Sequence, residues 1–385
     1  MTTAFQPYVS PWQPNAQLAW DTIELKPTRG IPSWLLNVME WKSLDILSGH
    51  PEGSYAQNPE QVYLDFQHQI GTCMLDQWIP TNPLSMGCHG YEAPSANANQ
   101  QPVIVRDGML IDSPEAVVAH MEKHLFPQWR EFARTLALEE EKSVQALIEQ
   151  ENTVQSLFGP NLLKVPYGGF QSFPGFMYGH YGYENYFMAI ALYTEVMEQA
   201  FKLQADYGEL ICRKAARAIR KGNLPRLVRL DHDMADSRGM LVNVKTLDKI
   251  WLPHFTRAIR PLIDGGIRAI WHCDGNLMDL VPRLLEAGIA GFQGFQYEDG
   301  MDYKKICRMK DRNGNPLLII AGVSVTRTLP HGTPEDVAKE MKWLVENGPK
   351  VGLFLGGSSS IAPGVKIENL KALVEGFRYY REHGR

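Results

Sequence analysis

The second half of the chain alternates short apolar runs with amphipathic helical patterns. Five apolar runs, which we expect to be strands, occupy 226–230, 268–271, 291–296, 317–321 and 351–355. Helical periodicity follows them at 245–264, 277–287, 301–309, 334–346 and 366–382. Strands that alternate with helices build parallel sheets through right-handed crossovers. Five such units in succession favour a closed α/β barrel over an open sheet.

The first half of the chain is less regular. Residues 1–32 are rich in Pro and polar residues but contain two tryptophans, so we expect an arm packed on the body. The remaining residues, 33–385, are expected to form a single barrel domain with helical insertions. Residues 81–110 lack periodicity and are expected to form an excursion, with a short hairpin at 103–111.

Helical patterns continue through the middle of the chain. Ser113 before Pro114 is typical of a helix start, because a serine hydroxyl caps free N–H groups and proline fits the first turn. Another helix is expected at 139–155, and the long pattern over 183–218 predicts two more.

Composition narrows the class of protein. The 385 residues are 44% hydrophobic and 21% charged, which is ordinary for a globular protein with a substantial core. The formal net charge of −5 gives no reason to expect a nucleic-acid or membrane partner, since both favour basic surfaces. Five scattered cysteines, no secretory signal pattern and no apolar run long enough to span a bilayer predict a cytoplasmic protein with reduced thiols.

Polar residues follow nearly every predicted strand of the second half. The side chains concerned are Asp231, His232, Asp233, His272, Cys273, Asp274, Glu298, Asp299, Ser324 and Ser358. In an α/β barrel the active site lies at the carboxyl ends of the strands. The sequence therefore predicts that the catalytic residues are His272, Asp274, Asp231 and Asp233.

His272 and Asp274 are two residues apart, so in a strand they point to the same face, with Cys273 on the other. An imidazole and a carboxylate in this arrangement are suitable metal ligands, and Glu298 after the next strand is the expected third. The alternative is that these groups hydrogen-bond the substrate or one another. Asp231 and Asp233 are expected to orient His272, to bind substrate or to act as acid or base; a helix cap with a salt bridge to Arg238 is the competing interpretation.

Aromatic residues are dense between 168 and 187, where Gly and Pro interrupt any helical periodicity. This segment is expected to wall a flat apolar pocket, although a loop packed into the core is a comparable alternative. The loop after 355, rich in Gly and Ser, is typical either of a phosphate-binding turn or of a tight turn. The expected substrate contacts are Phe170, Phe173, Phe176, Tyr178, Tyr181, Trp271, Asn276 and Ser358.

Four segments resemble the uroporphyrinogen decarboxylase superfamily, mainly from residue 180 to the C-terminus. They are Tyr181-Gly-Tyr-Glu-Asn-Tyr-Phe, Asp231-His-Asp-Met, Trp271-His-Cys-Asp-Gly-Asn and Leu355-Gly-Gly-Ser-Ser-Ser-Ile-Ala-Pro-Gly-Val-Lys-Ile-Glu-Asn-Leu. The resemblance implies a (β/α)8 TIM barrel, which agrees with the alternation of strands and helices. It also implies one of two activities, porphyrinogen decarboxylation or methyl transfer involving a corrinoid protein.

The departures from the family pattern favour methyl transfer. Decarboxylases of this family need an arginine-rich N-terminal motif for the carboxylates of their substrate, but the first hundred residues contain only Arg29. In the methyltransferases, a zinc ion is held by a His-x-Cys motif and a later Cys. Here His272 matches the histidine, while Asp274 and Ser358 replace the two thiolates.

The resemblance therefore implies a cobalamin-dependent methyltransferase with an oxygen-rich metal site or no metal. The expected partners are a corrinoid protein and a small methyl donor, for example an aromatic methyl ether that is O-demethylated. Zinc or another divalent ion at His272, Asp274 and Glu298 is the expected metal. A decarboxylase-like lyase and a non-catalytic tetrapyrrole- or corrinoid-binding protein are the alternatives. A homodimer is also compatible with the sequence.

Overall fold

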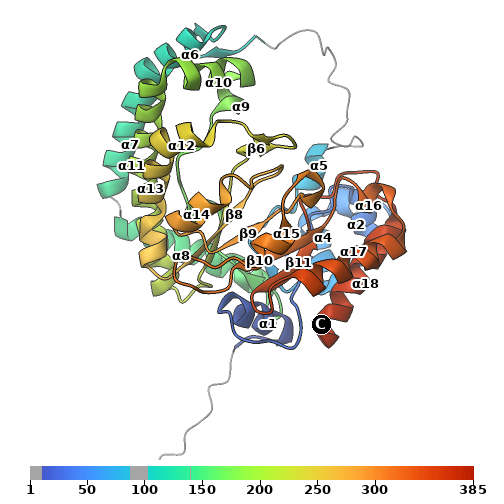
Figure 1. Ribbon diagram of the computed structural model, residues 1–385. Coiled ribbons are helices and arrows are strands. Elements are labelled where there is room, and N and C mark those ends of the chain that lie inside the picture. Colours follow the sequence, from blue (N-terminus) through green and yellow to red (C-terminus); the bar gives the residue numbers. More distant parts are fainter. Residues whose placement is uncertain (1–10, 87–102, 139) are drawn as a thin grey trace, which may run out of the picture.

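The computed structural model describes residues 11–86, 103–138 and 140–385 (Figure 1). Its central feature is a sheet of five parallel strands, and each strand coincides closely with one of the five apolar runs in the sequence. In spatial order they are β5 (Leu227–Asp231), β8 (Arg268–His272), β9 (Gly291–Gln293), β10 (Leu318–Val323) and β11 (Leu353–Gly357). Sequence order and spatial order coincide, as expected for successive right-handed βα units.

Shorter parallel segments continue this sheet around a ring. Ser33 forms a parallel bridge with Leu355 of β11, and Trp34 forms one with Met74 of β1 (Met74–Leu75). Strand β1 pairs in turn with β4 (Leu163–Lys164). The eight segments thus follow one another in the order of a (β/α)8 barrel. Within the described residues no backbone ladder joins β4 to β5, so the ring has one unpaired seam.

Helices of the second half cover the outside of the sheet. They are α12 (Val244–Ile250), α13 (Leu252–Asp264), α14 (Val281–Ala287), α15 (Tyr303–Ile306), α16 (Thr328–His331), α17 (Pro334–Asn347) and α18 (Ile367–His383). Thr333 caps α17 through a reciprocal hydrogen-bonded box with Asp336. The predicted helix at 245–264 is divided at Trp251, because Pro253 begins a new helix there.

The first part of the described chain supplies helices α1 (Pro14–Ile23), α2 (Trp41–Ser48), α3 (Ser54–Gln57), α4 (Pro59–Ile70) and α5 (Asn82–Met86). Helix α1 lies across one end of the barrel (Figure 1). It buries Ala16, Ala19 and Ile23, which agrees with an arm packed on the body. The predicted division of the chain at residue 32 stays a prediction.

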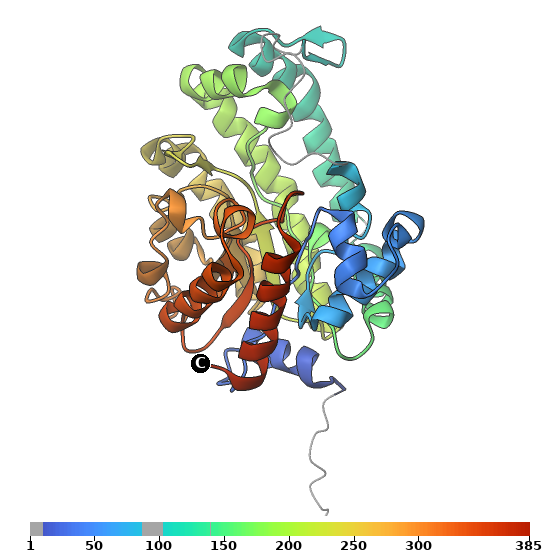
Figure 2. The same cartoon turned by 90° about the vertical axis from the view of Figure 1, so that its right-hand side faces the viewer.

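A long insertion follows the predicted excursion. It begins with the hairpin of β2 (Val105–Arg106) and β3 (Met109–Leu110), as predicted, and continues through α6 (Pro114–His120), which Ser113 caps. The helices after it are α7 (Phe126–Leu138), α8 (Glu140–Phe158), α9 (Tyr178–Tyr181), α10 (Tyr183–Leu192) and α11 (Thr194–Lys221). Figure 2 shows this helical part extending well beyond one end of the barrel. No described helix is long and apolar enough to cross a membrane.

Candidate functional site

The predicted catalytic side chains meet where β5 and β8 end. Asp231 and His272 are register partners on these neighbouring parallel strands. The Nε2 atom of His272 lies 3.9 Å from Oδ1 of Asp231 and 3.9 Å from Oδ1 of Asp274. The side chain of His272 is 10% exposed, whereas those of Asp231 and Asp274 are 32% and 39% exposed. The imidazole therefore forms the floor of a site whose carboxylates reach solvent.

Asp233 completes this cluster. Ligand atoms of Asp233, His272 and Asp274 all lie within 4.8 Å of one another, a spacing that suits a metal ion. A carboxylate oxygen of Asp233 accepts a hydrogen bond of 2.9 Å from the backbone N–H of Asp274, which fixes the two loops to each other. We call Asp231, Asp233, His272 and Asp274 the mouth cluster.

The two nitrogen atoms of His272 have different surroundings. Nδ1 is buried without a hydrogen-bond partner and lies against Gly294, where an added Cβ would come within 2.5 Å of it. Nε2 faces the carboxylates. Of the two nitrogen atoms of this nine-tenths buried ring, Nε2 is therefore the one available to the mouth cluster.

The pKa values of two carboxyl groups in the mouth cluster, Asp231 and Asp274, are shifted in opposite directions. Burial alone would raise the pKa of Asp231, but His272 and Arg229 outweigh it, so the pKa lies below its ordinary value and the group stays ionised. For Asp274 burial dominates. Although His272 opposes it, burial raises the pKa of Asp274, and the negative charges of Asp233 and Asp231 add to the effect. Asp274 is thus the carboxyl group better suited to carry a proton.

A buried ion-pair network supports Asp231, and sequence reasoning missed it. Arg229 on β5 donates to Oδ2 of Asp231 at 2.7 Å and to Asp76 at 2.6 Å. Tyr167 donates to the same oxygen of Asp231 at 3.1 Å, and its ring lies under the guanidinium. Trp34 donates its indole N–H to Asp76. Arg229 stands inside an apolar strand run, two residues before Asp231, and this spacing was the available signal.

Glu298, the predicted third metal ligand, is not part of the cluster. Its carboxylate accepts hydrogen bonds from the hydroxyl groups of Ser324 at 2.5 Å and Thr326 at 2.8 Å. Strand β9 ends at Gln293 because Gly294 turns away with a φ of +79°. Glu298 therefore lies five residues beyond the strand end rather than at it. Asp233 takes the third position that we expected for Glu298.

Two of the predicted substrate contacts are buried, and a third bonds within its own turn. Trp271 is fully buried and packs against Phe173, Trp251 and Phe255, because it points to the helix side of β8. Ser358 is also fully buried, and its hydroxyl accepts a hydrogen bond from the backbone of Val325. Its neighbour Ser359 is the residue that contacts Asp274, at 3.4 Å. Asn276 is partly exposed but bonds within its own turn.

The aromatic segment divides into core and boundary residues. Phe170, Phe176 and Tyr181 are buried. Phe173 and Tyr178 are partly exposed, and both rings contact His232, the residue between Asp231 and Asp233. His232 accepts a hydrogen bond from the backbone N–H of Phe176, and burial lowers its pKa, so it is held neutral. Through His232 the aromatic segment is attached to the end of β5.

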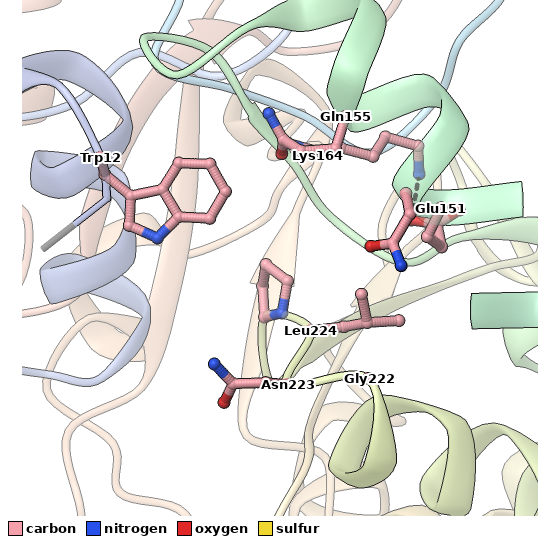
Figure 3. Close-up of a pocket in the computed structure, with 9 residues that line it drawn as sticks. Trp12, Glu151, Gln155, Lys164, Gly222, Asn223 and Leu224 are labelled. Atoms are coloured by element: carbon pink, nitrogen blue, oxygen red, sulfur yellow. Dashed lines mark hydrogen bonds and ion pairs between the residues drawn. The ribbon is translucent and has the colours of Figure 1, made fainter. Parts of the chain in front are cut away.

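A small cavity lies on the opposite side of the barrel from these strand ends. It has a volume of about 140 Å³ and lies between Trp12, helix α8 and the loop that precedes β5 (Figure 3). Its wall contains the buried ion pair of Lys164 and Glu151, with a contact of 2.8 Å. Gln155, one turn further along α8, accepts a hydrogen bond from the backbone N–H of Lys164. This pair therefore fastens α8 to β4, and we assign it a structural role.

Residues 232–380 match the family model of uroporphyrinogen decarboxylase (URO-D). The match begins beside Asp231 and includes the rest of the mouth cluster. The second part of the chain, from the end of β5 onward, is therefore similar to the uroporphyrinogen decarboxylase family. No curated protein matches the chain.

One solved structure has a similar fold over nearly the whole chain. A methyltransferase from Methanosarcina mazei is 17% identical, with a TM-score of 0.56, over 95% of this chain and 98% of that one. A B12-independent methionine synthase from Shewanella sp. W3-18-1 is 12% identical over 61% of this chain and 67% of that one, with a TM-score of 0.32, too low to support an argument. The first similarity supports a barrel fold for nearly the whole chain.

Proposed function

We propose that the protein is a methyltransferase that moves a methyl group between a small methyl donor and a corrinoid held by a partner protein. The observation that supports this most directly is the convergence of His272, Asp233 and Asp274 at the carboxyl ends of β5 and β8. The match of residues 232–380 to the URO-D family model and the fold similarity to a protein titled a methyltransferase support the same class.

A divalent metal ion fits the mouth cluster. Asp233, His272 and Asp274 would hold it, and one oxygen of Asp274 is buried without a hydrogen-bond partner. Two carboxylates and an imidazole without a thiolate suit zinc or a harder divalent ion. When bound, such an ion supplies Lewis acidity to the atom that leaves the methyl group.

The chain's own residues have separate roles in this proposal. Asp274 has a raised pKa and is the group best suited to deliver a proton to the leaving oxygen where no metal is bound. Asp231, ionised and fixed by Arg229 and Tyr167, orients the neighbouring imidazole. A phenolate leaving group needs either a proton or a Lewis acid. A phenyl methyl ether is therefore a suitable donor for this site.

The aromatic segment is proposed to hold the donor ring. Phe173 and Tyr178 are the partly exposed members next to the end of β5, and their flat faces suit a planar donor. Phe170, Phe176 and Tyr181 support them from the core. The corrinoid partner would approach the solvent-facing side of the mouth cluster and supply the methyl-accepting group.

The test is a methyl-transfer assay. The full-length protein is mixed with a reduced corrinoid protein and a panel of methyl ethers, and the absorbance of methyl-cobalt is followed. The proposal is supported if the parent protein transfers the methyl group and the Asp274→Asn variant does not. Release of carbon dioxide from a porphyrinogen without any corrinoid protein would instead support the lyase alternative. Corrinoid binding without turnover would support a binding protein.

A further inference from the structure

The mouth cluster holds more negative charge than the surrounding side chains offset. Asp231, Asp233 and Asp274 face one another across β5 and β8, and Asp76 lies buried behind Asp231. Among the residues that the structure describes, Arg229 is the guanidinium that contacts these acids, and it is shared between Asp76 and Asp231.

The remaining contacts of these acids within residues 11–86, 103–138 and 140–385 add no compensating cation. Asp233 accepts a backbone N–H, and Asp274 accepts the hydroxyl of Ser359. Tyr167 donates to Asp231 as a neutral hydroxyl. Since Arg229 balances Asp76, the carboxylates of Asp231 and Asp233 are left even when Asp274 carries a proton, and the imidazole of His272 offsets at most one of them. Within the described residues the site is therefore electronegative.

We infer that the mouth cluster selects its substrate by charge, so that the methyl donor is neutral or cationic and donors with a carboxylate or phosphate near the reacting end are excluded. The inference rests on the proposed function for its substrate class. A divalent metal at Asp233, His272 and Asp274 would offset two of the negative charges and leave the site slightly negative.

The surrounding structure strengthens this selection. The side chains of Asp231 and Asp274 are 32% and 39% exposed, and Asp233 is partly exposed, so solvent screens these carboxylates incompletely. The faces of Phe173 and Tyr178 carry partial negative charge and attract cations rather than anions. A unit charge about 8 Å from an incoming carboxylate, at an effective dielectric constant of about 20 to 30, changes binding by about tenfold.

A cysteine placed at the mouth measures this charge without any assumption about activity. Ser359 is partly exposed and makes one side-chain hydrogen bond, to Asp274, so Ser359→Cys is a conservative probe. Anionic iodoacetate and neutral iodoacetamide alkylate the same thiolate. The iodoacetate rate divided by the iodoacetamide rate, relative to the same quotient for a free thiol, reports the local electrostatic potential. Cys73, Cys212 and Cys273 are buried, Cys307 is partly exposed, and Cys88 lies outside the described residues. The alkylation rates of the unmodified protein are therefore subtracted as the background.

We expect iodoacetate to be disfavoured at least tenfold in metal-free Ser359→Cys protein, less so with zinc bound and much less in 1 M salt. Adding Asp231→Asn should reduce the discrimination several-fold. Asp264→Asn, an exposed acid at the opposite end of β8, should leave it unchanged. A ratio equal to that of the free thiol, or one insensitive to salt and to Asp231→Asn, would overturn the inference.

A matched pair of donors then connects charge to substrate choice. A methoxybenzamide and the corresponding methoxybenzoate have nearly the same shape and differ by one charge. The amide should be demethylated at least tenfold faster, and the difference should shrink in high salt. Loss of activity with every donor would count against the proposed function, whereas the alkylation ratio would still decide the charge of the mouth. Equal rates for the two donors would contradict the inference.

Discussion

Gly294 lies directly against the imidazole of His272, on the side away from the carboxylates. A Cβ at this position would be 2.5 Å from Nδ1 and 2.7 Å from Cε1, and the residue has a φ of +79°. The ring thus occupies the space that a side chain at position 294 would need. Gly294 helps to determine where Nε2 points.

Gly294→Ala should therefore displace His272 and weaken metal binding at least tenfold. Gly266→Ala is a suitable control, since Gly266 has a φ of +72° but no atom within 4 Å of an added Cβ. Both variants incur the left-handed backbone cost of about 1–2 kcal/mol. Only Gly294→Ala should also lose metal affinity in a zinc titration. Equal zinc affinity in the two variants would show that the contact does not position the ring.

The choice of metal ligands gives a second prediction. Asp233→Asn and His272→Ala should each lower zinc affinity by at least tenfold, because each removes one of the three clustered ligands. Glu298→Gln should keep the affinity, because the carboxylate of Glu298 is engaged by Ser324 and Thr326. Metal content after dialysis, measured by mass spectrometry, checks this. Metal loss in Glu298→Gln with retention in Asp233→Asn would reverse the assignment.

The ion pair between Arg229 and Asp76 predicts strong energetic coupling. Both side chains are almost fully buried, so removing one leaves an uncompensated charge. Arg229→Met or Asp76→Asn alone should reduce the free energy of unfolding by about 3–5 kcal/mol.

The double variant tests that coupling. It should cost clearly less than the sum of the two single changes, because it removes both buried charges together. Urea unfolding of the four proteins measures the difference. Additivity to within about 0.5 kcal/mol would mean that the two groups do not act as a pair.

Glu340 makes stability depend on pH. Burial raises the pKa of Glu340 to about 7, although a hydrogen bond from the backbone N–H of Ser324 opposes the shift. The unfolded chain releases this proton near the ordinary pKa of 4.5, so the contribution of Glu340 to stability falls as pH rises from about 4.5 to 7.

Glu340→Gln should remove this loss and be more stable than the parent by up to about 3 kcal/mol at pH 8, with little difference at pH 4. The glutamine retains an oxygen for the Ser324 N–H. Glu346→Gln changes an exposed acid on the same helix and should have little effect at either pH. Denaturant unfolding at both pH values measures the difference. The prediction would be refuted if the free energy of unfolding changed between pH 4 and pH 8 by the same amount in Glu340→Gln as in the parent protein.

The fold was largely predictable because strands and helices of the second half carry clear periodicities. All five strands appear close to their expected positions, and Ser113 and Thr333 cap helices as their sequence context predicts. The ring segment at 33–34, β1 and β4 were not predicted. They are at most two residues long in the structure, too short to produce a detectable pattern.

The candidate site was only partly predictable. Alternation along a strand correctly brought His272 and Asp274 to one face. It also implied that Trp271 points to the opposite side, which excludes it from the mouth. No local pattern locates the turn at Gly294, which carries Glu298 away from the strand end. Nor does any local pattern pair Arg229 with Asp76, which is 153 residues away along the chain. Such long-range contacts depend on the closure of the whole ring.

The unpaired seam between β4 and β5 has a consequence for how the barrel can adapt. At the other joints of the ring, backbone pairing in ladders or single bridges sets the strand spacing, but here Tyr167 and Arg229 meet through ring and guanidinium. Side-chain contacts of this kind can lengthen or shorten without breaking a ladder. The circumference of the barrel is therefore adjustable at the one joint that adjoins Asp231, and substitutions there would tune the width of the entrance while the other strands keep their register.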